Sequence, residues 1–512
     1  MKVNLGIGTY PRRRAVVRPE SIAIEFEGTS ITYGQFSKRV NRLAHALLGL
    51  GVKHQDRVAY VGFNHPALLE VFFAANLIGA IPVLVNPRLS AGEIDYIIED
   101  SGASVIFYGV DLIQEAEYLQ ELHPEITMVA VEGDEGPGLR REALKEASSD
   151  LDIELSVSDD DIALLMYTSG TTGRPKGAML SHRNLYFNYF NALLGQEIEQ
   201  GAVLLSVAPL FHIAGLNMTT IPVIMKGGKV IIHREFRPAQ VLDEIEQSKV
   251  SESFMVPAMV DMLSNDPSFA DRDLSSFRAI MVGGSPVSER VLRIWQARGV
   301  KIVQGFGMTE TAPGACLLEA ADANTHLGTA GRAHFFTDIK LVDPKTGEEV
   351  PTGTAGEVLI RGPHVMAGYW NRPEDTASAL KDGWYHSGDI AIKDENGYYT
   401  IKDRIKDMYI SGGENIYPAE VEQGLQELES VLDAAVIGVP DERWGETGIA
   451  FVSLRNSFLE NAPTGPELRA ELGNVLARYK LPREIHIIDQ LPRNATGKIQ
   501  KNILRDSIIP IS

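Results

Sequence analysis

The chain has 512 residues, of which 44% are hydrophobic and 23% charged, and its formal net charge is −20. This length exceeds one simple domain, the composition excludes a disordered protein, and the acidic balance disfavours a general nucleic-acid binder. The single cysteine, Cys316, excludes an internal disulfide and a cysteine metal cage. The N-terminus lacks the apolar core of a signal peptide, and no apolar stretch reaches bilayer-spanning length. These features predict a soluble, cytoplasmic protein.

A basic cluster near the start departs from the acidic average. It consists of Arg12, Arg13, Arg14 and Arg18. A solvated turn that caps the fold is the expected structure, and a patch that touches anionic lipid or a substrate tail is the alternative. A peripheral membrane contact therefore stays open, and so does a homodimer.

Short apolar runs alternate with helical patterns over the first 400 residues. Seven runs are predicted to be buried strands: 57–63, 81–87, 103–109, 162–170, 203–209, 278–284 and 301–307. Between them, 34–51 and 65–80 carry apolar residues at helical spacing. Such alternation predicts parallel sheets covered by helices on both faces, with ligands at the carboxyl ends of the strands.

The pattern changes after about residue 330. Segments 357–362 and 389–404 are predicted to be antiparallel, with a hairpin at Asn396-Gly397. A further unit follows, with a helix from Pro418, strands at 431–440 and 449–455, a helix at 464–478, a strand at 483–489 and a final helix. The expected fold class is α/β, with a large N-terminal domain of doubly wound sheets and a small antiparallel β region at 1–403. A small α+β domain is expected at 404–512.

The sharpest local signal is the segment 167–177, which reads YTSGTTGRPKG directly after an apolar strand. Glycines let backbone N–H groups converge on an anion, hydroxyl groups add donors, and Lys176 adds positive charge. The spacing of a Walker A loop is missing. The segment therefore predicts a phosphate-binding loop of another kind.

Five segments carry a resemblance to a known family. They are 167–177, QGFGMTE at 304–310, WYHSGD at 384–389, KDRIKDMYISGGENI at 402–416 and PRNATGK at 492–498. Together they resemble the motifs of the adenylate-forming superfamily, which contains acyl- and aryl-CoA synthetases, luciferases and peptide-synthetase adenylation domains. In overall texture the chain is most similar to bacterial medium- to long-chain fatty acyl-CoA synthetases.

This resemblance implies an ATP-dependent acid–thiol ligase that uses Mg²⁺ and coenzyme A. A carboxylate attacks the α-phosphorus of ATP to give an acyl-adenylate and pyrophosphate, and a thiol then displaces AMP. The resemblance further implies that Lys498 bridges the carboxylate and the α-phosphate. By the same resemblance, Glu310 and Thr168 position the metal, and His212 orients the acyl group.

The resemblance also implies a nucleotide-binding set. In it, Asp389 accepts the ribose hydroxyls, Arg404 makes a second ribose contact, and Phe306 stacks on adenine. The full set for ATP and AMP is Thr168, Ser169, Gly170, Thr171, Thr172, Gly173, Lys176, Gly283, Gly284, Ser285, Gln304, Gly305, Phe306, Gly307, Met308, Thr309, Asp389, Arg404 and Lys498.

The second half-reaction is assigned by the resemblance to the C-terminal domain, which would be mobile and swing about a hinge at Lys406. Coenzyme A would contact Ser411, Gly412, Gly413, Trp444, Tyr479 and Arg483. From residue 478 onward, seven lysines and arginines stand against three acids, a net charge of 7 − 3 = +4. A basic tail of this kind suits the phosphates of coenzyme A.

The acyl pocket is expected at His212, Ala214 and Gly215, within the apolar segment 211–218. It offers no charge to an amino acid or to a second carboxylate, so a medium- to long-chain fatty acid is the expected substrate. Three alternatives stay open: an acyl-AMP ligase that loads a carrier protein, a CoA ligase for aryl or short-chain acids, and a luciferase-type oxygenase. Trp444, Tyr479 and Arg483 favour free CoA as acceptor.

Overall fold

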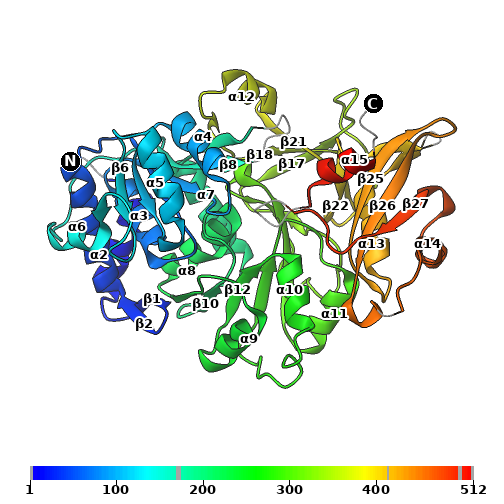
Figure 1. Ribbon diagram of the computed structural model, residues 1–512, viewed down its shortest axis with the longest axis horizontal. Helices are drawn as coiled ribbons and strands as arrows, with labels where there is room; N and C mark the ends of the chain where they lie inside the picture. The colour runs from blue at the N-terminus through cyan, green and yellow to red at the C-terminus, as the bar shows by residue number, and fades with distance from the viewer. Residues whose placement is uncertain (1–3, 169–173, 412–413, 460, 494–498, 509–512) are drawn as a thin grey trace.

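The computed structural model describes residues 4–168, 174–411, 414–459, 461–493 and 499–508. Two large sheets and their helices form the N-terminal part, and the C-terminal strands and helices lie to one side of it (Figure 1). Within the described ranges, no helix is long and apolar enough to cross a membrane.

The first large sheet has eight strands in the order β19-β9-β8-β4-β3-β5-β6-β7. Strands β3 to β8 pair in parallel, whereas β9 and β19 add antiparallel pairs at one edge. The strands are β3 (Arg57–Val61), β4 (Ile81–Val85), β5 (Ala103–Tyr108), β6 (Thr127–Ala130), β7 (Leu139–Arg140), β8 (Ile162–Thr168), β9 (Lys176–Ser181) and β19 (Gly368–Tyr369).

The second large sheet has nine strands in the order β16-β15-β14-β13-β12-β10-β11-β1-β2. Its centre is parallel, and both edges are antiparallel. The strands are β1 (Ile22–Phe26), β2 (Thr29–Thr32), β10 (Val203–Ser206), β11 (Lys229–Ile232), β12 (Glu252–Met255), β13 (Ala279–Val282), β14 (Lys301–Gly307), β15 (Gly314–Leu317) and β16 (Arg332–Ala333).

A smaller antiparallel sheet follows, in which β22 pairs with β21. It contains β17 (Asp338–Val342), β18 (Ala355–Arg361), β20 (Leu380–Lys381), β21 (Trp384–Lys393) and β22 (Tyr399–Arg404). The C-terminal sheet contains β23 (Tyr409–Ser411), β24 (Glu414–Ile416), β25 (Val431–Asp441), β26 (Gly445–Leu454) and β27 (Glu484–Ile487). The expected α/β class with a small antiparallel region and a C-terminal α+β unit is therefore confirmed.

The helices follow the amphipathic patterns of the sequence, and α2 begins at a capping box between Thr32 and Gln35. The α-helices are α1 (Tyr10–Val17), α2 (Tyr33–Gly49), α3 (Pro66–Leu77), α4 (Ala91–Ser101), α5 (Ile113–Leu122), α6 (Arg141–Glu146), α7 (His182–Gly195), α8 (Ile221–Lys226), α9 (Pro238–Gln247), α10 (Pro257–Ser264), α11 (Glu289–Ala297), α12 (Pro373–Ala379), α13 (Pro418–Gln426), α14 (Gly465–Leu472) and α15 (Lys501–Ile508). A π-helical segment, η3 (Gly215–Thr220), leads directly into α8.

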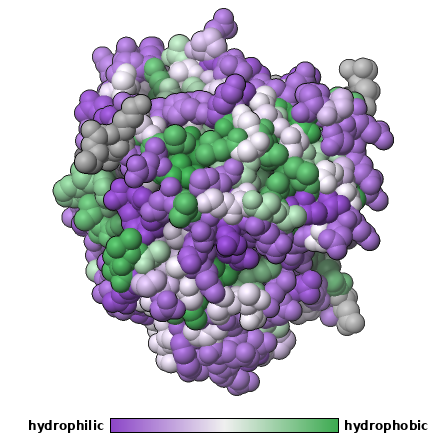
Figure 2. All heavy atoms as spheres, turned by 90° about the vertical axis from the view of Figure 1, so that its left-hand side faces the viewer, coloured by the Kyte–Doolittle hydropathy of each residue, from purple (hydrophilic) through white to green (hydrophobic). Residues whose placement is uncertain are grey.

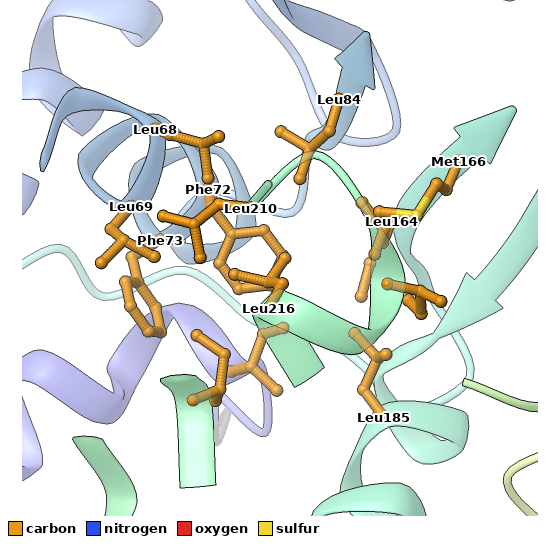
Figure 3. Close-up of a cluster of buried hydrophobic side chains, with 14 of the residues drawn as sticks. Leu68, Leu69, Phe72, Phe73, Leu84, Leu164, Met166, Leu185, Leu210 and Leu216 are labelled. Carbon is orange, nitrogen blue, oxygen red and sulfur yellow. The ribbon is translucent and has the colours of Figure 1, made fainter. Parts of the chain in front are cut away.

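The main core lies where the two large sheets meet. Helix α3 is buried along its whole length, as expected for a helix that is apolar on every side. Figure 3 shows its side chains Phe72 and Phe73 in one cluster with Leu164 of β8 and Leu216 of η3. This core fixes the position of η3, which carries part of the expected acyl pocket.

Two details of the sequence-based fold are wrong. The arginine cluster begins in a helix, α1, with Pro11 in its first turn, and not in a turn. Arg12 pairs with Asp152 at 3.2 Å. Figure 2 views the molecule from the side on which the N-terminus lies, and this face is mostly hydrophilic with apolar patches. The helix expected at 464–478 ends at Leu472, and Gly473 follows it.

Candidate active site

The candidate phosphate loop begins and ends on neighbouring strands. Strands β8 and β9 pair antiparallel with Thr168 opposite Lys176, so the two ends of the loop lie side by side. Five loop candidates lie outside the described residues: Ser169, Gly170, Thr171, Thr172 and Gly173. The structure therefore places the flanks of this motif.

Glu310 is a buried carboxylate at one end of this hairpin. It lies in the 3₁₀ turn Thr309–Thr311 that follows β14. The Thr168 Oγ1 atom is 3.5 Å from Glu310 Oε1, so the two residues expected to hold a metal are neighbours. The backbone carbonyl of Glu310 accepts a 2.8 Å hydrogen bond from the N–H of Met366, which fixes the turn.

Sequence reasoning missed the tyrosine that orients Glu310. The Tyr369 hydroxyl donates a 2.8 Å hydrogen bond to Glu310 Oε1. Burial, together with the Glu310 carboxylate, raises the pKa of Tyr369 well above its ordinary value, so the phenol remains a donor. Tyr385 of β21 lies beside both residues, and its pKa is also raised, mainly by burial. Tyr369 carries no motif, and although Tyr385 lies within the WYHSGD segment at 384–389, the motif did not indicate its contact with Glu310.

Lys176 has a partner that the sequence did not reveal. Its Nζ atom forms an ion pair with Asp375 of α12 and lies 5.6 Å from the centre of the Tyr369 ring. Helix α12 thus reaches over the end of β9 and holds the ammonium group next to the Glu310 cluster. In this position the Lys176 ammonium group can leave the Asp375 carboxylate and pair with a phosphate of an incoming nucleotide instead.

The two ribose candidates lie opposite each other in the antiparallel sheet. Asp389 of β21 pairs in register with Arg404 of β22, and Arg404 Nε is 3.3 Å from Asp389 Oδ1. Asp389 is buried, whereas Arg404 is partly exposed. The Asp389 carboxylate also helps to raise the pKa of Tyr385, which places it near the Glu310 cluster.

The adenine candidates lie at the adjacent carboxyl ends of β13 and β14. Val282 pairs with Gln304, so Gly283 follows one strand beside Gly305 in the other. A Cβ at Gly307 would lie 1.7 Å from the Pro313 carbonyl oxygen, so only glycine fits there. This close packing fixes the backbone on either side of Phe306, the residue expected to stack on adenine.

Three further members of the expected nucleotide set have different surroundings. The Gln304 side chain accepts from Val287 N–H at 3.2 Å and is therefore tied to the protein itself. The N–H of Met308 donates to the Pro313 carbonyl at 3.0 Å, within the turn that presents Glu310. Ser285 is exposed, just after Gly284, whose φ of 95° requires glycine.

His212 is partly exposed as a residue, and its imidazole is electrically neutral. Removal of the ring from water, together with the nearby positive charge of Arg88, lowers its pKa to about 4. Its Nε2 atom has no hydrogen-bond partner among the described residues. A neutral imidazole with an uncommitted nitrogen can hydrogen-bond a substrate oxygen, which agrees with an orienting role more than with general-base catalysis.

An apolar cluster lies beside His212. It contains Ala214 together with Ala192, Ala208, Met218, Phe254, Met281, Val303, Leu317 and Ala320. Most of these residues come from η3, from β12 to β15 and from α7, and Ala208, Ala214 and Ala320 lie in connecting segments. The cluster therefore joins the η3 wall to the second large sheet. The acyl pocket expected at His212, Ala214 and Gly215 stays a prediction, and this cluster is the apolar surface next to it.

The CoA candidates form a separate, exposed surface on the C-terminal sheet. Ser411 of β23 pairs with Gly445, next to Trp444, and Arg483 Nη1 lies 3.5 Å from Asp441 Oδ2. Trp444 is 46% exposed and Tyr479 is 53% exposed. Exposed aromatic rings of this size are available to stack on a ligand.

Three candidates cannot be placed in this site. Gly412, Gly413 and Lys498 lie outside the described residues. Lys406 is exposed, in the turn between β22 and β23 where Asp407 N–H bonds the Arg404 carbonyl at 3.1 Å. Its role as a hinge stays a prediction.

Comparison with known proteins identifies the family. Residues 11–370 match the family described as AMP-binding enzyme, and residues 420–498 match the AMP-binding enzyme C-terminal domain. A feruloyl-CoA synthase from Amycolatopsis sp is 46% identical over 503 residues, which cover 98% of this chain and 99% of that protein. A long-chain fatty acid–CoA ligase of Mycobacterium tuberculosis is 36% identical over 505 residues, covering 98% of each chain.

Comparison with solved structures leads to the same family. The o-succinylbenzoate CoA synthetase of Bacillus subtilis, in complex with its acyl-adenylate intermediate, is 31% identical with a TM-score of 0.86. That match covers 97% of this chain and 98% of the other. The same enzyme has also been solved with ATP and a magnesium ion. The chain therefore belongs to the AMP-binding enzyme family, the adenylate-forming superfamily that its motifs resemble.

Proposed function

We propose that this protein is an AMP-forming acid–CoA ligase that acts on an aryl-substituted carboxylic acid. In the first step an oxygen of the acid attacks the α-phosphorus of ATP, and pyrophosphate leaves. In the second step the thiolate of CoA attacks the acyl carbon, and AMP leaves with the bonding electron pair. The observation that carries the proposal is the convergence of Thr168, Glu310 and Lys176 at the end of one hairpin.

The residues at this hairpin suit a magnesium–nucleotide complex. In the described ranges, no group of three or more His, Cys, Asp and Glu side chains could hold a metal ion by itself. Mg²⁺ commonly takes one or two carboxylates and completes its shell with substrate phosphates and water. Glu310 and Thr168 fit this requirement, and the ion would neutralise phosphate charge. Tyr369 would fix the Glu310 carboxylate, and Lys176 would meet a phosphate oxygen.

Other residues would hold the rest of the substrates. We assign Asp389 and Arg404 to the ribose, Phe306 and the 283–285 backbone to adenine, and residues 169–173 to the outer phosphates. Lys498 would bridge the acid and the α-phosphate during adenylation only. The domain boundary at 403–404 and the hinge at Lys406 belong to the same proposal, in which Ser411, Gly412, Gly413, Trp444, Tyr479 and Arg483 bind CoA.

The choice of an aryl acid rests on two observations. The apolar cluster beside His212 contains Phe254, Met218 and Met281, which offer flat and adaptable contacts to a ring. The relative named feruloyl-CoA synthase matches nearly the whole chain at 46% identity, ten percentage points above the long-chain fatty acid–CoA ligase at 36%. The fatty acid expected from the sequence remains the second candidate, because that second relative also covers 98% of the chain.

Competition between acids tests the proposal. We expect kcat/KM for ferulate to exceed that for octanoate and palmitate, and amino acids and dicarboxylates to be poor substrates. Pyrophosphate release without CoA would report adenylation, and thioester formation would report transfer. A preference for palmitate would replace the aryl assignment by the fatty-acid one, and absence of pyrophosphate release with every acid would refute the ligase.

A further inference from the structure

Helix α7 carries three buried asparagines along one face. Asn184, Asn188 and Asn191 are spaced by four and three residues, so their side chains point in the same direction. Each reaches a different segment. Asn184 donates to the carbonyls of Pro363 and Val365, and Asn191 accepts from Phe336 N–H. A buried amide is costly unless its donors and acceptors are used, so each of these contacts has a structural reason.

The Asn188 side chain supplies a hydrogen bond that is missing from the backbone of η3, the segment next to the expected acyl pocket. In the π segment η3, the N–H of Ile221 bonds the carbonyl of Leu216, five residues earlier. The carbonyl of Asn217 therefore loses that donor, and the next residue in the same register, Pro222, has no N–H. Asn188 Nδ2 donates to the Asn217 carbonyl at 3.0 Å. The side chain thus supplies the hydrogen bond that the helix cannot make.

The oxygen atom of the same Asn188 amide accepts a hydrogen bond from β15, at an irregularity in the pairing of that strand. The pairing of β14 with β15 slips between Phe306 and Gly307. Gly314 begins β15 at this irregularity, and its N–H donates to Asn188 Oδ1 at 3.1 Å. A Cβ at Gly314 would lie 3.4 Å from Asn188 Oδ1 and 2.7 Å from His334 Nε2, so the approach is close. Gly314 is four residues after Glu310.

We propose that Asn188 is a positioning residue that sets the separation of the two walls of the acyl site. One wall is η3, which carries Met218 in the apolar cluster, and the other is β15, which carries Leu317 in the same cluster. The inference rests on the proposed function, because that function places the acyl group at this cluster.

Neighbouring contacts make Asn188 the only one of these groups that joins both walls. Tyr189 donates to Asn217 Oδ1 at 3.0 Å, and Gln196 donates to the Met218 carbonyl at 2.9 Å, so both reach η3 alone. Leu216 is packed in the core that Figure 3 shows, which prevents η3 from shifting as a whole. Losing the Asn188 amide should therefore loosen the acyl site and leave the nucleotide side in place.

The test compares Asn188→Ala with Asn191→Ala, a matched control from the same helix with the same residue type and burial. With ferulate, CoA and ATP, we expect Asn188→Ala to raise KM for the acid roughly tenfold. KM for ATP should change less than about twofold, and the preference for ferulate over octanoate should fall. If Asn188→Ala does not fold, the Asn188→Ala, Pro222→Ala double variant takes its place: it should fold, because the N–H of residue 222 replaces the lost donor, and a double variant that also fails to fold would overturn the inference.

A rescue variant makes the test specific. Pro222→Ala restores an N–H that can reach the Asn217 carbonyl, so the Asn188→Ala, Pro222→Ala double variant should recover most of the lost affinity for the acid. Additive effects of the two changes, or equal changes in the KM values for acid and ATP, would overturn the inference. A wild-type protein that forms no acyl-CoA from any acid would instead refute the proposed function.

Discussion

The surroundings of Glu310 and those of Trp444 are built in opposite ways. Glu310 is buried, and Tyr369 and Thr168 lie against its carboxylate. Trp444 and Tyr479 are half-exposed, and Arg443 lies 4.7 Å from the centre of the Trp444 ring. Contacts within the protein hold the first region in place, as expected for a site that stabilises developing charge. The second offers surface for a ligand to cover, so we expect its contribution to be binding.

Of the substitutions considered, the loss of Lys498 should slow the first half-reaction, adenylation, the most. Lys498→Ala should reduce adenylation by roughly a thousandfold, because the lysine screens the approach of two anions. Thioester formation from a preformed acyl-adenylate should be spared and serves as the internal control. Pyrophosphate release and acyl-CoA yield measure the two steps, and an equal loss of both would show that the lysine has a general role.

Glu310→Gln should come next, with roughly a hundredfold slower adenylation and a weaker response to magnesium. The change keeps the shape of the side chain and removes its charge. Tyr369→Phe should give a smaller loss in the same direction, because it removes only the hydrogen bond that orients Glu310. Glu348→Gln, at an exposed position, is the control. A wild-type magnesium titration in Glu310→Gln would rule out the metal assignment.

Trp444→Ala should raise KM for CoA by about tenfold and leave adenylation unchanged, since stacking of this kind contributes modestly. Phe335→Ala removes another exposed aromatic side chain, 78% exposed and on the N-terminal domain, and should change neither step. Steady-state kinetics with CoA as the varied substrate measure the effect. An unchanged KM for CoA would remove Trp444 from the acceptor site.

The smallest effect on activity should come from three buried histidines outside the proposed site, His182, His334 and His364, which act on stability. Burial lowers the pKa of His182 and His364 to about 3, and that of His334 to about 4. Unfolded histidines take up protons below about pH 6.5, so the unfolded state binds more protons in this window, and stability falls as pH falls from about 6.5 to 4.

Each histidine should account for up to about 1.4 kcal/mol of unfolding free energy per pH unit. Denaturant unfolding of His364→Asn and of the wild type, at pH 7 and pH 5, measures this dependence. The variant should lose less stability between the two pH values than the wild type. Identical losses would show that His364 is not held neutral by burial.

The sequence predicts the fold well where patterns are local and poorly where contacts are distant. All seven strands expected in the first 310 residues are present, because short continuous apolar runs are typical of buried parallel strands. The helix predicted at 464–478 is too long, because α14 ends at Leu472. The amphipathic pattern continues past Gly473, but the chain forms a turn there.

The same limit applies to the site. Motifs located Thr168 and Glu310, which the structure brings to 3.5 Å from each other. Tyr369, Asp375 and Asn188 carry no motif, and their importance comes from partners 59, 199 and 126 residues away in the chain. Pairings over such separations depend on the folded topology, so single-sequence reasoning could not find them.

The most direct test of the central claim is a rapid-quench experiment on Lys406→Pro that measures acyl-AMP and acyl-CoA separately. The account holds that adenylation uses the N-terminal site together with Lys498 from one orientation of the C-terminal domain, whereas transfer to CoA needs that domain to turn about Lys406. Proline fixes φ near −65° and should block that turn. We predict acyl-AMP formation at nearly the wild-type rate and acyl-CoA formation reduced by roughly a hundredfold. A normal rate of acyl-CoA formation would contradict the account.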